Sequence, residues 1–400
     1  MNNEDSDGAR RIPRNVTDDY SDAAVARRRR WVEERTTAQL GALAGDPIDA
    51  QVFRGNIENL IGTVQLPVGI AGPYVIHGQN IDGEVFIPMA TTEGALVASY
   101  ARGMKAISAS GGAHTRLVCA ELTAGVTFVF PNLLDAHGFI AWLGCVTEAL
   151  RTCADATTRH GKLLRVEPRA IGRRVFVNFV YDTADALGIN MATVATTAAS
   201  DWIMQNADPR PLVRNLPGGM QGEKWANALD FLHGRGRRVV SEAMVSRAVL
   251  NEQLRVEAQD MQDAWISMAL AKMNAGGLGA SFHAANGVAA LMLATGQDAA
   301  YLTALTAIVV MEARPNGDLH VSIDIPTLGV GTVGGGTGLP PFRACLDLMG
   351  CDGSGKANRL AEIIAAVCIA GETSTVAAIV SGEFVAAHER LGRNRPETLI

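Results

Sequence analysis

Cysteine is scarce in this sequence and is not arranged as a metal-binding or redox pair. Six cysteines are scattered along 400 residues, and no two have the CxxC spacing. Structural zinc sites and thiol redox centres use such pairs, so we expect reduced thiols in a cytoplasm and no metal site. The positions are Cys119, Cys145, Cys153, Cys345, Cys351 and Cys368.

The chain also lacks the features of nucleic-acid-binding and membrane proteins. Its formal net charge is −6, and its one basic run, residues 27–30, is expected on the solvated face of a helix, so no nucleic acid is predicted. Apolar stretches such as residues 302–311 are too short to cross a bilayer, and the first residues lack the apolar core of a signal peptide. We therefore expect no membrane partner and a cytoplasmic location.

The composition is that of a folded protein with large hydrophobic cores. Apolar residues make up 48% of the 400 residues and charged residues 19%, which predicts two or three globular domains. Mixed helical and strand patterns predict an α+β or α/β fold, with an inserted α+β block at about 115–215. Strands are expected at residues 84–89, 115–130, 173–181 and 319–325. Helices are expected at residues 22–40, 51–62, 135–158, 185–205, 249–275, 281–295, 298–311, 341–349 and 356–380. Ser21 or Asp22 would cap the first of these helices, and the last would continue towards His388.

One stretch, residues 87–107, joins an extended segment to a helical pattern. Apolar residues recur every three or four positions after a corner of small residues, and Glu93 is expected in the first turn of the helix. A carboxylate there has two interpretations. It either complements the helix dipole or serves as an acid at the wall of a catalytic cleft.

A glycine-rich segment at residues 329–334 fits the pattern GxGxxG. A dinucleotide-binding fingerprint also needs a helix that opens inside the motif and an acidic residue about 20 positions later. Here more glycines and two prolines follow instead. We therefore do not expect a Rossmann unit, although a backbone cradle for a phosphate stays open.

Eight short segments, spread along most of the chain, can be read together. They are residues 58–62 (ENLIG), 66–73 (LPVGIAGP), 88–94 (PMATTEG), 185–191 (DALGINM), 283–286 (HAAN), 296–298 (GQD), 331–337 (GTVGGGT) and 370–372 (AGE). In this order they resemble the signature segments of the 3-hydroxy-3-methylglutaryl-CoA (HMG-CoA) reductase family. The loop position of Lys224 resembles the class I branch, and the chain is similar to the soluble bacterial and archaeal members.

The resemblance implies an architecture and an assembly. It implies a large α/β domain around a buried helix and a small ferredoxin-like domain that binds the cofactor without a Rossmann fold. We place an N-terminal helical segment at 1–50, the large catalytic domain at 51–114 and 217–400, and the small domain at 115–216. A homodimer or dimer of dimers with shared active sites is implied as well.

The resemblance also implies a reaction and the residues that perform it. An acyl-CoA thioester is reduced to an alcohol by two hydrides, through a hemithioacetal and an aldehyde. Glu93 matches the acid, and burial would have to raise its pKa for that role. Lys224 matches the cation that stabilises the carbonyl oxygen, and Asp298 the carboxylate that orients Lys224; a surface lysine and a helix N-cap are the alternatives. His388 matches the residue that protonates the CoA thiolate, and an exposed histidine on a frayed helix is its alternative.

The implied cofactor is NADPH, with NADH as the alternative. Asp185, Gly188 and Asn190 lie in one family nucleotide-binding segment, and Gly334 and Gly335 in another. Thr158 and Arg159 align with a pair that holds the 2′-phosphate, for which a guanidinium is suited. Around the acyl site, Ser99, His283 and Asn286 resemble supporting groups.

Three positions depart from the family pattern at the acyl site. Ala124, Pro217 and Trp225 stand where the family has side chains that bind the free carboxylate of the substrate. A buried carboxylate without partners is costly. This suggests an alternative in which the same chemistry acts on a less charged acyl thioester, carried on CoA or a carrier protein, with Trp225 offering apolar surface. A non-catalytic nucleotide or CoA sensor is a remote alternative.

Overall fold

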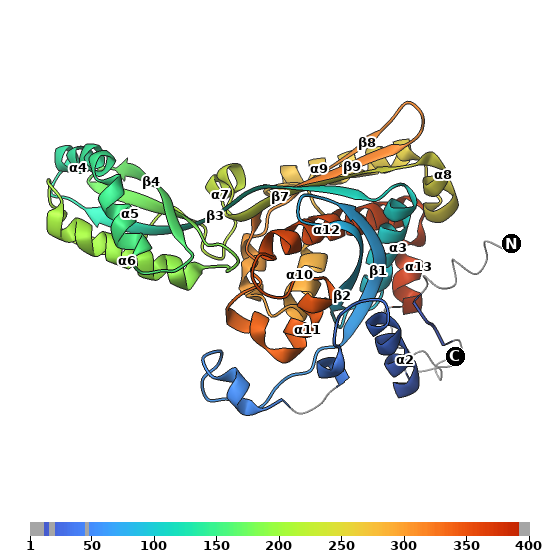
Figure 1. Ribbon diagram of the computed structural model, residues 1–400. Helices are drawn as coiled ribbons and strands as arrows, with labels where there is room; N and C mark the ends of the chain where they lie inside the picture. The colour runs from blue at the N-terminus through green and yellow to red at the C-terminus, as the bar shows by residue number, and fades with distance from the viewer. Residues whose placement is uncertain (1–11, 16–20, 45–47, 392–400) are drawn as a thin grey trace.

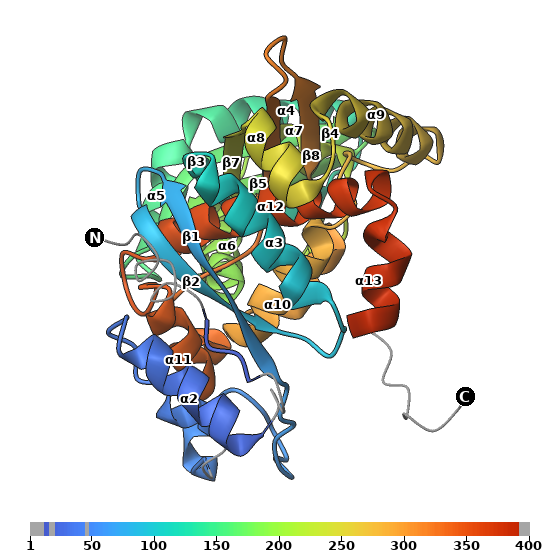
Figure 2. The same ribbon diagram turned by 90° about the vertical axis from the view of Figure 1, so that its right-hand side faces the viewer.

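A single buried helix lies at the centre of the larger part of the molecule. The computed structural model describes residues 12–15, 21–44 and 48–391. Helix α12 (Ala357–Val380) is mostly apolar, and most of its residues are fully buried. Figure 2 shows it among the other helices and the sheet. A helix that is hydrophobic all round belongs in a core. It is also long and apolar enough to cross a bilayer, but 89% of its most apolar window is buried inside the protein.

A six-strand path of sheet packs against this helix, in the order β2-β1-β3-β7-β9-β8 (Figure 1). The pairs are antiparallel except for β1 with β3. Buried and less buried residues alternate along β7 and β9, because one face of the sheet covers the core. The strands are β1 (Val68–His77), β2 (Asp82–Ala90), β3 (Ala113–Val129), β7 (Gly236–Val245), β8 (Ile308–Ala313) and β9 (Leu319–Leu328).

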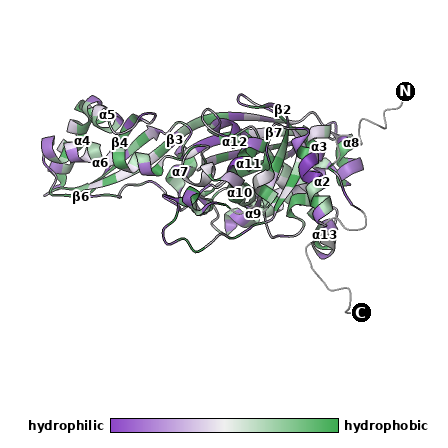
Figure 3. Cartoon of the chain, turned by 60° about the horizontal axis from the view of Figure 1, so that its bottom comes forward, coloured by the Kyte–Doolittle hydropathy of each residue, from purple (hydrophilic) through white to green (hydrophobic). Residues whose placement is uncertain are grey.

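A second, separate core lies to one side, as Figures 1 and 3 show. Strand β3 is long enough to serve both parts: it pairs with β7 up to Glu121 and with β5 from Leu122 onward. Three helices pack on this smaller sheet. Its elements are α4 (Leu133–Cys145), α5 (Thr147–Asp155), β4 (Lys162–Ile171), β5 (Arg174–Asp182), α6 (Ile189–Asn206) and β6 (Val213–Asn215). The expected mixed α/β fold is confirmed, whereas the domain boundaries stay a prediction.

The remaining elements surround the central helix. Helix α2 begins after Ser21, whose side chain accepts a hydrogen bond from the Ala24 amide. Helix α3 is the continuation of the stretch after β2. The elements are α2 (Asp22–Glu33), η1 (Gly41–Ala44), η2 (Ala50–Phe53), α3 (Leu96–Ala109), α7 (Ala228–His233), α8 (Arg247–Val249), η3 (Leu250–Leu254), α9 (Ala258–Asn274), α10 (Ala284–Ala294), η4 (Ala299–Ala304), η5 (Gly335–Gly338), α11 (Pro340–Leu348) and α13 (Glu383–Leu391).

Several expected elements differ from the structure. The helix expected at 298–311 is wrong: a short 3₁₀ turn is followed by strand β8. The helix expected at 135–158 is two helices bent by 69°, and the one expected at 249–275 is interrupted by a π-turn before α9. The helix expected at 22–40 ends at Glu33, and the one at 185–205 begins at Ile189. In place of a helix at 51–62 there is only the short 3₁₀ turn η2, which ends at Phe53. Helix α13 is separated from α12 by Ser381 and Gly382.

Candidate active site

Lys224 and Asp298 meet at the surface between the two cores. The Lys224 Nζ atom lies 2.8 Å from Asp298 Oδ2, and the two side chains are 39% and 40% exposed. Lys224 has φ = 60°, which is uncommon for a residue with a side chain and concentrates at functional sites. Asp298 also caps η4, because its Oδ1 accepts a hydrogen bond from the Ala300 amide. Asp298 is therefore the cap of η4 and also the ion-pair partner of Lys224, whereas its catalytic role stays a prediction.

A buried network that the sequence did not reveal supports the lysine loop. The Glu223 carboxylate accepts a hydrogen bond from the Tyr301 hydroxyl at 3.0 Å and pairs with Arg235 at 2.6 Å. The Arg235 side chain is only 3% exposed. Burial raises the pKa of Tyr301 to about 12, so its hydroxyl stays a donor. Since Glu223 precedes Lys224, this network fixes the backbone that presents the lysine.

The glycine-rich loop is fastened to the neighbour of Asp298. The Gln297 side-chain amide donates to the Gly331 carbonyl and accepts from the Gly331 amide, both at 2.9 Å. A Cβ atom on Gly331 would lie 2.5 Å from the Leu187 nitrogen, so only glycine permits this approach. The loop thus joins Asp298 to the segment that contains Asp185.

The two predicted nucleotide-binding segments therefore lie side by side. Ala186 and Val333 form a parallel bridge, and Asp185 accepts hydrogen bonds from the Gly355 and Ala357 amides at the start of α12. A cavity of about 430 Å³ adjoins Asp185, within the range of small-ligand sites. Its lining residues are Ala120, Asp182, Ala184, Asp185, Gly355 and Asn358.

Residues outside the lining of this cavity, near the start of α6, suit an anion better than its two carboxylates, Asp182 and Asp185, do. Gly188 is the N-cap of α6 with φ = 88°, and Asn190 is exposed in the first turn of that helix. The loop containing Thr158 approaches the same helix end, because a Cβ on Gly161 would lie 2.6 Å from the Met191 side chain. Arg159 is exposed there, and open space surrounds the Cα atoms of Gly334 and Gly335. Helix N-termini and guanidinium groups both favour anions.

Arg237, which the sequence did not single out, holds these segments together. Its guanidinium donates to the carbonyls of Val330 and Ala184 and to the Asn358 side chain. Burial lowers its pKa to about 10, although the nearby carboxylates of Asp185 and Asp182 oppose that shift. An alternating strand pattern marks Arg237 as an inward residue, and an inward arginine is the signal that could have identified it.

A third group of predicted residues meets beside α3. The Tyr100 hydroxyl donates to the His283 carbonyl at 2.5 Å, and the two rings stack with centroids 4.8 Å apart. Asn286 Nδ2 lies 3.3 Å from His283 Nδ1. Ser99 contacts the Ser374 hydroxyl at 3.2 Å on α12. The structure thus brings His283 and Asn286 together, whereas Ser99 contacts Ser374; the role of all three at an acyl site stays a prediction.

Glu93 lies outside the helix in which it was expected. Helix α3 begins at Leu96, after Ala95 in a left-handed conformation, and Glu93 is exposed in the preceding turn. The expected position in the first helical turn is therefore wrong. Glu93 is near enough to contribute to the raised pKa of Tyr100, whose main cause is burial. No hydrogen bond or ion pair joins Glu93 to Lys224 or Asp298 among the described residues.

The remaining predicted residues fall in different settings. Trp225 is 54% exposed beside Lys224, and Pro217 lies in the loop before it. Ala124 is buried in the smaller core, where an arginine would have to leave that core to reach a substrate. His388 lies on α13, and its side chain is outside the described residues.

Comparison with known proteins identifies the family of the chain. The family model described as hydroxymethylglutaryl-coenzyme A reductase matches residues 24–393. The chain is 42% identical to 3-hydroxy-3-methylglutaryl-coenzyme A reductase of Halobacterium salinarum, over 94% of this chain and 95% of that one. It is 38% identical to the enzyme of the same name from Haloferax volcanii, over 93% and 94%.

A solved structure shares the fold. The class II 3-hydroxy-3-methylglutaryl-CoA reductase of Streptococcus pneumoniae, bound to NADPH in open conformations, has a TM-score of 0.67 at 20% identity, with 85% of this chain and 91% of that chain covered. At this identity the likeness concerns the fold alone. The family model and the archaeal relatives each cover nearly the whole sequence. The chain therefore belongs to the hydroxymethylglutaryl-coenzyme A reductase family.

Proposed function

We propose that this enzyme reduces HMG-CoA to mevalonate and free CoA in the cytoplasm, with NADPH as the hydride donor. The observation that carries the proposal is the Lys224–Asp298 pair, fastened through Gln297 to the glycine-rich loop and so to the Asp185 segment. A cation for the thioester carbonyl thus lies next to a backbone suited to a nucleotide. The family membership supports this assignment.

NADPH, when bound, supplies the two hydrides. Asp185, Gly188, Asn190, Gly334 and Gly335 would surround it. Thr158 and Arg159 would hold its 2′-phosphate, since a guanidinium suits that group. The open backbone at the two glycines and the exposed end of α6 fit this role.

Each side chain of the acyl site has its own role in the reaction. Lys224 stabilises the negative charge that develops on the carbonyl oxygen, and Asp298 orients its ammonium. Glu93 gives a proton to the oxygen, and His388 gives one to the departing CoA thiolate. Ser99, His283 and Asn286 shape the acyl pocket. The loop position of Lys224 supports a class I arrangement.

Exposed surfaces support the proposal of a homodimer or dimer of dimers with shared sites. Glu93 is exposed in a single chain, so the cover that an acid in a catalytic cleft needs would come from substrate or from a second subunit. The segment before β1 has no regular structure and exposes apolar side chains such as Ile61 and Val64, at 104% and 90%. A monomer rarely leaves such a segment uncovered.

Kinetics on the purified chain test the proposal. We expect HMG-CoA to drive oxidation of two NADPH per molecule, with mevalonate and CoA as products, and Lys224→Ala to abolish it. Uncharged acyl-CoA thioesters serve as the comparison, because Ala124, Pro217 and Trp225 suggested a less charged substrate. The relatives all carry the HMG-CoA reductase name and give that alternative no support. Turnover of an uncharged thioester in preference to HMG-CoA would refute the proposal.

A further inference from the structure

A buried carboxylate on the central helix holds the turn that carries His283. Glu372 lies on α12 and is fully buried. Its Oε1 atom accepts hydrogen bonds from the amides of Phe282, His283 and Ala284, at 2.8, 2.8 and 2.9 Å. These are donors at the start of α10, which no intrahelical acceptor satisfies. One oxygen atom therefore fixes three consecutive backbone positions.

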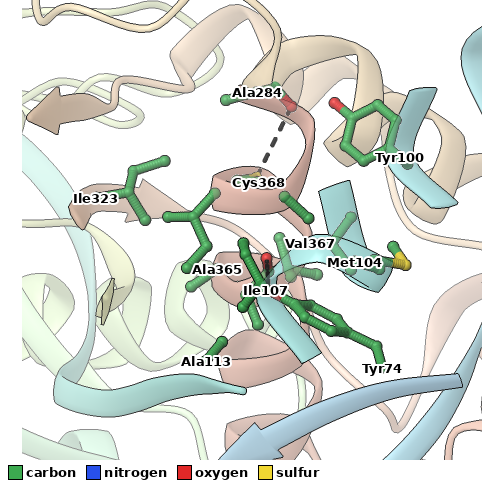
Figure 4. Close-up of a cluster of buried hydrophobic side chains, with 14 of the residues drawn as sticks. Tyr74, Tyr100, Met104, Ile107, Ala113, Ala284, Ile323, Ala365, Val367 and Cys368 are labelled. Carbon is green, nitrogen blue, oxygen red and sulfur yellow. Dashed lines mark hydrogen bonds between the residues drawn. The ribbon is translucent and has the colours of Figure 1, made fainter. Parts of the chain in front are cut away.

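The same turn is held on its other sides. The Lys272 ammonium on α9 donates to the Ser281 carbonyl at 2.9 Å. The Tyr100 hydroxyl donates to the His283 carbonyl, and its ring lies against the His283 imidazole. Figure 4 shows Tyr100, Ala284 and Cys368 converging from three helices. The turn is thus bonded to α3, α9 and α12 at once.

Two glycines make room for Tyr100 in this arrangement. A Cβ on Gly371 would lie 2.4 Å from the Tyr100 ring, and one on Gly287 would lie 2.5 Å from its hydroxyl. Gly371 and Glu372 are neighbours on α12. One residue therefore admits the ring that stacks on His283, and the next binds the amide of His283.

We propose that Glu372 is a positioning residue of the active site, which fixes His283 and Asn286 against the acyl group by holding the 282–284 amides. The proposal deepens the proposed function and rests on it. Glu372 does not reach the reacting atoms. It acts through the first turn of α10, where Asn286 lies 3.3 Å from His283 Nδ1. Loss of its oxygen lets both side chains shift, and a displacement of about 1 Å can cost about 10²-fold in rate.

The chain offers a matched control on the same helix. Glu362 is also fully buried on α12, and its oxygens accept the amides of Gln79 and Asn80 in the turn between β1 and β2. It lies ten residues from Glu372, about 15 Å along the helix. E372A and E362A each remove a buried backbone-binding carboxylate, but only the first releases the His283 turn. We expect E372A to lower kcat about 10²-fold with the NADPH Kd unchanged, and E362A to keep kcat.

The conservative variants complete the test. E372Q retains an oxygen that can accept hydrogen bonds from the three amides, so we expect its kcat to stay close to that of the wild type. E372D has a side chain shorter by one methylene, which draws the oxygen away from the amides, so we expect a low kcat. If E372A yields no folded protein, this pair decides: kcat in E372D equal to or above that in E372Q overturns the proposal. So does full kcat in E372A, or equal loss in E362A. A wild-type chain that binds NADPH but does not reduce HMG-CoA refutes the proposed function itself, and the role of Glu372 falls with it.

Discussion

Replacing Asp298 by asparagine should separate catalysis from stability. Asn keeps the oxygen that caps η4 and removes only the charge that faces Lys224. The cap is therefore retained, because Asn and Asp are comparable N-cap residues. What changes is the ion pair at 2.8 Å.

The stability cost of that change is small. Two unit charges at this distance interact by about 1.5 kcal/mol in water. Both side chains are more than one third exposed, so salt and side-chain entropy reduce the net value to about 0.2–1 kcal/mol. For a chain of this size we expect Tm to fall by about 2 °C at most.

The catalytic cost is larger. Without Asp298 the ammonium of Lys224 loses the group that orients it towards the carbonyl oxygen, and removal of one such stabilising contact costs about 10²–10³ in kcat. The loss of NADPH absorbance on addition of HMG-CoA measures kcat, and thermal unfolding measures Tm. Glu312→Gln, which discharges an exposed pair with Arg314 at 3.3 Å, is the control. An Asp298→Asn enzyme with wild-type kcat, or a Tm loss large enough to explain its inactivity, would refute this reasoning.

Three further outcomes can be checked. Arg159→Ala should raise the Kd for NADPH about 10- to 100-fold and leave that for NADH unchanged, as titration by fluorescence would show; equal effects on both would contradict the 2′-phosphate assignment. Gly371→Ala should lower the free energy of unfolding, measured with denaturant, by about 1–3 kcal/mol, because the new methyl group would clash with the Tyr100 ring. In a Tyr100→Ser background the same substitution should cost less, whereas strictly additive effects of the two substitutions would contradict the clash. Burial raises the pKa of Glu372 above 4.5, so the folded state binds its proton more tightly and stability is lost as pH rises through the folded pKa. Wild type should therefore lose stability relative to Glu372→Gln as pH increases above 4.5; a pH-independent difference between their unfolding midpoints would contradict this.

The parts of the fold that the sequence predicts best are those with one dominant pattern. The apolar run of residues 356–380 predicts α12 because a helix buried on all sides needs no polar face. The run at 302–311 is equally apolar but forms a strand, β8, in its second half. Short apolar runs do not distinguish buried strands from buried helices.

Strand β4 could not be recognised, because it is an edge strand with exposed charges and Pro168. Among the described strands it pairs with β5, and Leu163 is its one buried residue, so no hydrophobic pattern marks it.

The sequence led to those candidate site residues that lie in segments resembling the family. It did not lead to the residues whose hydrogen bonds hold those segments in place. Lys224 and Asp298 were paired by the resemblance, and the 2.8 Å contact agrees with that. Arg237, Glu223 and Tyr100 depend on partners distant in sequence: Tyr100 and His283 are 183 residues apart. No local pattern encodes such a contact. The start of α3 was misplaced because its N-cap, Ala95, has no side chain that could mark the start of the helix.

The shared strand β3 has a mechanical consequence. Its first half is hydrogen-bonded into the larger sheet and its second half into the smaller one, with the change between Glu121 and Leu122. A strand held on both sides resists bending but can still twist about its own axis. The smaller part, with Thr158 and Arg159, should therefore rotate about β3 relative to Lys224 and not swing away from it. The Ala186–Val333 bridge and the hydrogen bonds of Asp185 also join the two parts, so a wide rotation about β3 would have to break them.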